Sequence, residues 1–225
     1  MGPSESAAEG RGDHFPLSGR TVVSLRTGTT DPSLGRVRLR GFARLPMKGI
    51  VFNLLEGAVV RQYGEDTWDD LLEAAGLDGA YTSLGSYPDQ QLTDLVVAAS
   101  ASTGTDPQAI VRWFGREAMP ALAAAYPGFF VPHHDIGSFL GTLNDIIHPE
   151  VRKLYPGADV PTFGFTTAGD GTITMRYGSP RRLCAFAEGL IEGAATQFGQ
   201  VVTIEQPRCM LRGDELCTIE IHVGH

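Results

Sequence analysis

Residues 176–182, RYGSPRR, bring a phenol, a hydroxyl and a guanidinium into one short segment. In extended backbone Tyr177 and Ser179, two positions apart, project to the same side. The guanidinium of Arg181 is a planar fork that suits carboxylates. Ser179 is expected to cap the helix that follows, with Pro180 as its first residue. Two interpretations stay open: a carboxylate-binding corner at a helix N-terminus, or a plain helix start in which Arg181 is solvated and Tyr177 packs in a sheet.

A histidine about thirty residues upstream is the second candidate. His148 follows an apolar helical face, and Pro149 cannot donate a hydrogen bond to the carbonyl of Asp145, so the helix is expected to kink or restart at His148. The apolar face consists of Phe139, Leu140, Leu143, Ile146 and Ile147. A histidine at such a place is most often a hydrogen-bonded core residue. The alternative is axial ligation of a haem iron through neutral imidazole, and a carboxylate clamp would then suit the two haem propionates.

Three cysteines are the third candidate. Cys184 lies in a long helical pattern, and Cys209 and Cys217 flank the expected turn CMLRGDELC. Zinc favours thiolate and imidazole ligands in closed tetrahedral sites, so a zinc site is one interpretation. Reduced buried thiols and a redox-labile Cys209–Cys217 pair are the others. An odd number of cysteines does not make a disulfide framework and fits a reducing, cytoplasmic setting.

The elements that carry these residues follow from hydrophobic periodicity. Helical patterns cover residues 50–64, 66–76, 88–104, 106–119, 120–128 and 135–148. After Pro161 the period changes to two, which predicts a hairpin over 161–177, a long helix over 180–198 and a second hairpin over 201–223. We therefore predict an α+β fold, in which an N-terminal helical subdomain precedes a four-stranded antiparallel sheet with one long inserted helix.

Composition and charge limit the domain organisation, the partners and the location that the chain can have. Residues 1–46 carry seven arginines against four acidic residues and show no sustained period, so we predict a mostly disordered extension before a domain at 47–225. The whole chain has a net charge of −8, which argues against a nucleic-acid partner. No apolar run is long enough to span a membrane, and no secretory signal is visible. We expect a cytoplasmic protein that binds neither nucleic acid nor membranes.

From Met47 to Val223 the chain resembles the haem-nitric-oxide/oxygen-binding (H-NOX) family, bacterial relatives of the sensor domain of soluble guanylate cyclase. The resemblance is carried by MKGIVFNLLEGAVVRQYG, IIHPEVRKLYPGADVPTF and RYGSPRRLCAFAEGLIEGAATQFG. It implies haem b between the helical subdomain and the sheet, with His148 as the iron ligand. It also implies that Tyr177, Ser179 and Arg181 hold the propionates and that Pro161 presses on the porphyrin. Around the distal pocket it places Val51, Leu55, Ala118, Phe186 and Leu190.

The same resemblance implies the function. Family members that hold O2 use a distal tyrosine where this chain has Phe186, and none of the five distal residues offers a hydrogen-bond donor. We expect a haem-based gas sensor that binds nitric oxide, and CO in vitro, at ferrous His-ligated haem, without stable O2 binding. We expect no enzymatic activity. The signal is expected to pass to a separate protein, such as a histidine kinase or a diguanylate cyclase.

The metal and the rival functions stay open. A subset of the family holds a structural zinc on three cysteines and one histidine, and the position of that histidine is Gln206 here. Zinc on Cys184, Cys209 and Cys217, with His222 or a water as fourth ligand, therefore stands beside a site with no metal. One rival function is a haem-free module of the same fold that binds another small apolar acid. The other is a zinc or haem enzyme.

Overall fold

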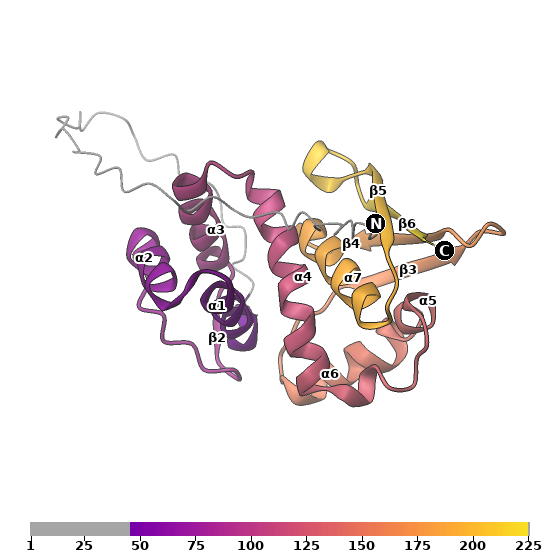
Figure 1. The fold of residues 1–225 in the computed structure, drawn as a ribbon, viewed down its shortest axis with the longest axis horizontal. Helices are drawn as coiled ribbons and strands as arrows, with labels where there is room; N and C mark the ends of the chain where they lie inside the picture. Colours follow the sequence, from indigo (N-terminus) through magenta and orange to yellow (C-terminus); the bar gives the residue numbers. More distant parts are fainter. Residues whose placement is uncertain (1–45, 225) are drawn as a thin grey trace, which may run out of the picture. The chain divides into compact units, whose positions relative to one another are not determined.

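The computed structural model describes residues 46–224 (Figure 1). The predicted extension, residues 1–46, lies outside the described residues except for Pro46. The N-terminal helices are α1 (Gly49–Tyr63), α2 (Glu65–Ala75), α3 (Gln90–Thr103) and α4 (Pro107–Ala125). Both α1 and α3 contact α2 and α4, so the helices form one packed subdomain, as predicted. A short antiparallel pair that the sequence did not predict, β1 (Pro46–Lys48) with β2 (Ser86–Pro88), joins it.

Helix α4 runs through Pro120, where the sequence predicted two helices. Asp106 caps it as expected, because its Oδ1 accepts from the amides of Gln108 at 2.8 Å and Ala109 at 3.2 Å. Pro120 removes the hydrogen bond that the carbonyl of Arg116 would accept. Helix α4 nevertheless continues, because it packs closely along α7 (Cys184–Gln197), and this tertiary packing overrides the local effect of the proline. The prediction of a break at Pro120 was wrong.

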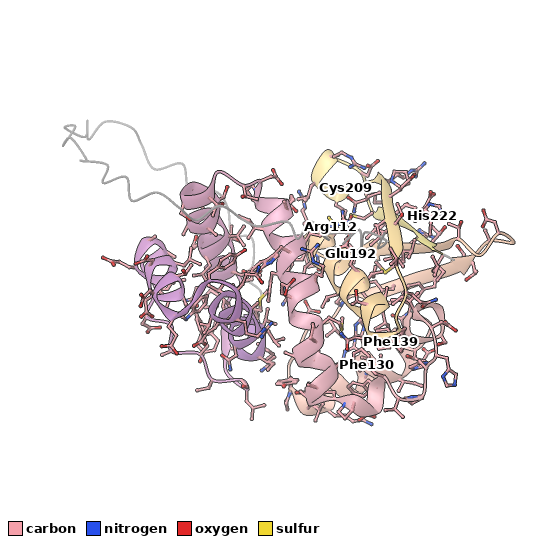
Figure 2. All side chains as sticks on the ribbon, in the orientation of Figure 1. Arg112, Phe130, Phe139, Glu192, Cys209 and His222 are labelled. Carbon is pink, nitrogen blue, oxygen red and sulfur yellow. The ribbon has the colours of Figure 1, made fainter. Side chains whose placement is uncertain are left out.

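Ion pairs join the same two helices. Arg112 of α4 lies 3.0 Å from a carboxylate oxygen of Glu188 and 2.6 Å from one of Glu192, both on α7 (Figure 2). Glu188 is almost fully buried, and this burial raises its pKa, while the charge of Arg112 opposes the shift. Since removing one partner of a buried pair leaves a charge uncompensated, the pairs fix how α7 lies along α4.

The segment before the sheet is broken into short pieces. A 3-10 turn (η1, Pro127–Phe129) leads to α5 (Ile136–Leu140), a π-helical turn (η2, Leu143–Ile147) and α6 (His148–Leu154). The sequence predicted one helix over residues 135–148, and the structure divides it. The restart at His148 is confirmed, because α6 begins there with Pro149 in its first turn.

The sheet contains β3 (Thr162–Thr167), β4 (Ile173–Gly178), β5 (Val202–Arg208) and β6 (Cys217–Val223). The strands are antiparallel in the order β3-β4-β6-β5, so both predicted hairpins are confirmed. A 3-10 turn (η3, Met210–Arg212) lies in the second hairpin. The buried faces of β4 and β6 share one apolar core with α7 and α5. Over residues 46–224, no helix has both the length and the apolar character needed to cross a membrane.

Helix α7 begins later than predicted. Its N-cap is Leu183, whereas the sequence favoured Ser179 as the cap and Pro180 as the first helical residue. Residues 179–182 instead form a turn, in which the amide of Arg182 donates to the carbonyl of Ser179 at 3.0 Å and Arg182 has a φ of 52°. The hydroxyl of Ser179 accepts from the amide of Arg181 at 3.3 Å. Because α7 begins only at Cys184, the predicted cap was wrong.

Candidate functional site

A cavity of about 350 Å³ lies among α1, α4, α6, α7 and the first strands of the sheet. Each residue that α1 and α7 contribute to its wall carries a hydrocarbon side chain, including Val51, Leu54, Phe186 and Leu190. Polar side chains line the wall at His148, at the corner formed by residues 177–181 and at a few other positions. An apolar cavity of this size with a few convergent polar groups is the usual form of a small-molecule site.

His148 lies on the wall of this cavity at the start of α6. Its Nδ1 is buried and has no hydrogen-bond partner among residues 46–224. Its ring packs against Phe163 with the centroids 5.3 Å apart. Burial, and then the charge of Arg152, lower the pKa of His148 to about 4, against a raising effect of the Pro161 backbone. The imidazole is therefore neutral near pH 7, which is the form that binds metals.

The structure brings Tyr177, Ser179 and Arg181 together on the same cavity wall. Tyr177 and Ser179 are buried, and the side chain of Arg181 is only 9% exposed. The Nη1 of Arg181 lies 3.0 Å from Asp159 Oδ2, and its Nη2 donates to the carbonyl of Pro46 at 2.9 Å. Its Nε is buried and has no partner among the described residues. The interpretation of Arg181 as a solvated residue was therefore wrong.

The phenol of Tyr177 is protonated at neutral pH. Burial raises its pKa above the usual 10.0, although interactions with the Ser179 side chain and the Leu183 backbone act in the other direction. A protonated phenol beside a hydroxyl and a guanidinium gives three donors on one wall. This set can bind carboxylate groups.

The predicted pocket residues divide into two groups. Four of them line the cavity: Val51, Pro161, Phe186 and Leu190. Leu55 and Ala118 are buried but lie outside the lining, where their chain neighbours Leu54 and Met119 are found instead. A shift of one position rotates a side chain by about 100° around a helix axis, so the helices were placed correctly and these two side chains were not.

Two tyrosines of the cavity wall were missed. The hydroxyls of Tyr126 and Tyr155 are hydrogen-bonded to each other, and burial together with this bond raises the pKa of Tyr155 to about 12. Tyr155 follows His148 by seven positions, two helical turns, and so lies on the same side of α6. That spacing was visible in the sequence. One phenol donates to the other, and neither belongs to α1 or α7.

The three cysteines meet in the structure. All are buried, and their sulfurs lie within 4.8 Å of one another, with Cys184 and Cys209 at 3.7 Å. Burial raises the pKa of the Cys217 thiol to about 12, and raises that of Cys184 while a hydrogen bond from Gln206 lowers it. The sequence suggested a disulfide pair of Cys209 with Cys217, and the structure makes this only one of the possible pairings.

The fourth ligand expected for zinc is not at this cluster. His222 lies elsewhere on the sheet, where its Nδ1 is 3.2 Å from Thr172 Oγ1 and its neighbours are Glu205 and Glu220 (Figure 2). The prediction of His222 as a zinc ligand was wrong, because Thr203 rather than a cysteine is its cross-strand partner on β5. Gln206 is a poor zinc ligand, so the described residues give zinc no support.

The geometry can now be compared with known proteins. A sequence profile described as haem-NO-binding matches residues 48–206. The chain belongs to the H-NOX family. It is 36% identical to an H-NOX protein from S. oneidensis in the Fe(II)NO ligation state, with 80% of this chain and 100% of that chain covered and a TM-score of 0.75.

Two further H-NOX structures are similar. The IWP-051-bound H-NOX from Shewanella woodyi in the Fe(II)CO state is 34% identical, with 78% and 93% of the chains covered and a TM-score of 0.67. The unliganded Fe(II) H-NOX protein from K. algicida is 26% identical, with 80% and 97% covered and a TM-score of 0.72. The predicted α+β fold is therefore the H-NOX fold, and this H-NOX protein falls in a family of haem-based sensor domains rather than enzymes.

The residues of this H-NOX cavity fit haem. Haem requires an apolar cavity, an axial nitrogen and donors for two carboxylates. Two residues of the cavity wall each carry a buried nitrogen without a partner among residues 46–224, Nδ1 of His148 and Nε of Arg181. An unsatisfied buried polar group costs about 1–3 kcal/mol, and these two atoms are of the types that an iron and a carboxylate would satisfy.

Proposed function

We propose that this H-NOX protein is a nitric oxide sensor that holds non-covalent haem b in the cavity. His148 is the iron ligand, Tyr177, Ser179 and Arg181 bind the propionates, and Pro161 contacts the porphyrin. Bound haem would supply a ferrous iron that takes a diatomic gas. The observation that carries the proposal is the pair of unpartnered buried nitrogens on His148 and Arg181, two residues that line one apolar cavity. The sequence has no C-x-x-C-H motif for covalent attachment, which supports haem b.

The side chains of His148 and Arg181 are already in states that suit haem binding. The low pKa of His148 keeps its imidazole neutral and able to coordinate. Asp159 and the carbonyl of Pro46 hold the guanidinium of Arg181 in place, while its Nε has no partner among the described residues. Such preorganisation reduces the entropy lost on binding.

Ligand selectivity follows from the wall that α1 and α7 form. Bound O2 is polar and favours a nearby hydrogen-bond donor, whereas nitric oxide binds ferrous iron strongly without one. The hydrocarbon side chains of this wall, with Phe186 packed on Phe114 at a centroid distance of 4.8 Å, exclude water and offer no donor. The protein therefore binds nitric oxide, and CO in vitro, without stable O2 binding.

The output is a separate protein, such as a histidine kinase or a diguanylate cyclase. The H-NOX fold accounts for residues 46–224, and family members are sensor domains, so the response to the gas is read outside this fold. The setting is the cytoplasm, which the three buried free thiols favour. The sensing domain is residues 47–225, with residues 1–46 as an extension.

Haem titration of the haem-free protein tests the proposal. Arg181→Leu replaces the guanidinium by a shorter apolar side chain, and we expect haem affinity to fall about 10-fold or more, as for loss of a charge-assisted bond. Arg208→Leu, on β5 and away from the cavity lining, is the matched control and should bind haem as the wild type does. Equal affinity of all three proteins would refute the carboxylate clamp, and absence of haem binding by the wild type would favour the haem-free module.

A further inference from the structure

Asn144 makes two hydrogen bonds to the backbone of a single residue of β3. Its Nδ2 donates to the carbonyl of Phe163 at 2.6 Å, and its Oδ1 accepts from the amide of Phe163 at 3.0 Å. Strand β3 is an edge strand of its sheet. Both backbone groups of an antiparallel residue point to the same side, so Asn144 pairs with Phe163 as a neighbouring strand would.

Asn144 belongs to the π-helical turn that leads directly into His148. In that turn the amide of Ile147 donates to the carbonyl of Thr142, five residues earlier, at 3.0 Å. Single π turns of this kind occur frequently at functional sites. Residues four apart lie on the same helix face, so Asn144 and His148 both face β3, one through hydrogen bonds and the other through ring packing.

Phe163 connects the two ends of the proposed haem site. Its ring packs against the His148 imidazole at a centroid distance of 5.3 Å and against the Tyr177 ring at 5.9 Å. Phe163 and Tyr177 are also paired across β3 and β4. Fixing the backbone of Phe163 therefore fixes a ring that contacts both the proposed iron ligand and a proposed propionate donor.

We propose that Asn144 is a positioning residue of the site. By clamping Phe163, it sets the orientation of the His148 imidazole relative to the Tyr177–Arg181 corner. Asn144 does not line the cavity, and the hydrogen bonds of its side chain are made to Phe163 rather than to His148. The inference rests on the proposed function, because it assigns His148 to the iron.

The test is Asn144→Ala in the full chain reconstituted with haem. Outer partners of metal ligands typically contribute about 10- to 100-fold to metal affinity, so transfer of haem to an excess of apomyoglobin should be about 10-fold faster than in the wild type. The iron–imidazole stretching band of the ferrous protein in resonance Raman spectra should shift to lower frequency. The control is Asn53→Ala, which removes the only other asparagine, whose amide lies 3.0 Å from Ser83 Oγ in the helical subdomain. Both readouts of the control should match the wild type.

A second comparison separates positioning from a general effect on the fold. In His148→Gly protein supplied with free imidazole, the iron ligand is no longer attached to α6. Adding Asn144→Ala to that background should leave the haem transfer rate within about 2-fold, because the clamp would then have no tethered ring to orient. A 10-fold effect in both backgrounds would overturn the positioning role.

If Asn144→Ala does not fold, Asn144→Asp serves instead. The aspartate keeps an acceptor for the Phe163 amide and loses the donor to the Phe163 carbonyl, so a change in the same direction is expected. Wild-type transfer rates and an unshifted Raman band in whichever variant folds would overturn the inference. Failure of the wild-type protein to bind haem would instead refute the proposed function, so the two failures are distinguishable.

Discussion

Phe186 is the residue on which the proposed ligand selectivity of the cavity depends. It stands in the hydrocarbon wall that α7 contributes, and its ring packs against Phe114. A tyrosine there would add one hydroxyl to a wall without donors. The proposed selectivity against O2 therefore depends on the absence of a single hydroxyl group at this position.

Phe186→Tyr is expected to allow a stable O2 complex. A buried hydroxyl without a partner is unfavourable, so the new phenol should donate to a bound polar ligand. The absorption spectrum of the reduced protein in air measures this, with Leu190→Met as a control that keeps the wall apolar. A stable oxy spectrum of the wild type, or none of the variant, would contradict the selectivity account.

The lowered pKa of His148 should make the stability of the haem-free protein depend on pH. Its pKa falls from 6.5 in the unfolded chain to about 4 in the folded protein. Between these values the unfolded chain binds a proton that the folded protein does not, so the free energy of unfolding decreases as the pH is lowered from about 6.5 to 4. The shift corresponds to roughly 1–3 kcal/mol after allowance for partial exposure of the ring.

Urea unfolding at pH 7 and pH 4.5 measures this dependence. His148→Gln should lose less stability between the two pH values than the wild type, by most of that amount. His222→Gln, which removes an imidazole on the sheet, should keep the wild-type dependence. If the two variants behave alike, burial of His148 is not the cause.

Local features, a proline after His148 and a two-residue spacing on one strand, made His148, Tyr177, Ser179 and Arg181 candidates, and the resemblance to the H-NOX family implied their roles. The sequence did not predict Asn144, whose partner Phe163 lies 19 positions away and is bonded through its backbone. Nearly every residue type offers the same backbone amide and carbonyl, so the sequence does not show which backbone groups a side chain will bind. The hydrogen bond between the side chains of Tyr126 and Tyr155, 29 positions apart, was missed because the sequence does not show which distant side chains meet.

Among the elements, α4 and α7 form the closest contact. A Cβ at Gly189 of α7 would lie 1.9 Å from the carbonyl oxygen of Arg112, and one at Gly115 of α4 would lie 2.4 Å from that of Phe186. Glycine at these positions lets two backbones approach, which no side chain would permit. Phe186 and Leu190 on α7 reach the cavity because of this packing.

Gly189→Ala should therefore destabilise the protein by about 1–2 kcal/mol. Alanine normally stabilises a helix interior by roughly 0.5–1 kcal/mol relative to glycine, but here the backbone of α4 must move, and overpacking typically costs 1–3 kcal/mol. Gly57→Ala in α1, where the nearest atom is Arg61 Nη1 at 3.5 Å, is the control and should be slightly stabilising. Thermal unfolding of both variants gives the comparison, and a Gly189→Ala protein as stable as Gly57→Ala would contradict the packing.

Element boundaries were the weakest part of the sequence prediction. The break at Pro120 and the cap at Ser179 each followed a sound local rule, and each was overridden by contacts with distant parts of the chain. Helix α4 continues because α7 supports it, and residues 179–182 turn because Arg181 is anchored on Asp159 and Pro46. The pair of β1 with β2 joins segments about forty positions apart, and strands of three residues give no periodic signal.

At the scale of the whole molecule, the site draws on both ends of the described chain. The carbonyl of Pro46 accepts a hydrogen bond from Arg181, so the point where the N-terminal extension joins the domain also supports the carboxylate clamp. The hydrophobic patterns predicted the order of the helices and strands, which is why the fold class was correct. They could not show that the first strand and the corner after β4 meet.

A fragment of residues 46–225 is expected to fold and bind haem with the absorption spectrum of the full chain. A fragment that begins at Met47 loses the Pro46 carbonyl, and one hydrogen bond to a charged group contributes about 1.5–3 kcal/mol, so its haem affinity should fall by roughly 10-fold or more. Haem titration of the two fragments measures the difference. Equal affinities would show that Pro46 does not support Arg181, and failure of the longer fragment to fold would show that the domain begins earlier.

The central claim is that His148 coordinates iron at a haem that binds nitric oxide. The ultraviolet–visible spectrum of the reduced protein, with and without nitric oxide, for the wild type and His148→Gly tests it most directly. The wild type should show a Soret band that shifts when nitric oxide is added, and His148→Gly should show altered ferrous coordination that free imidazole restores. A colourless protein after expression with sufficient haem, or a His148→Gly spectrum identical to that of the wild type, would contradict the account.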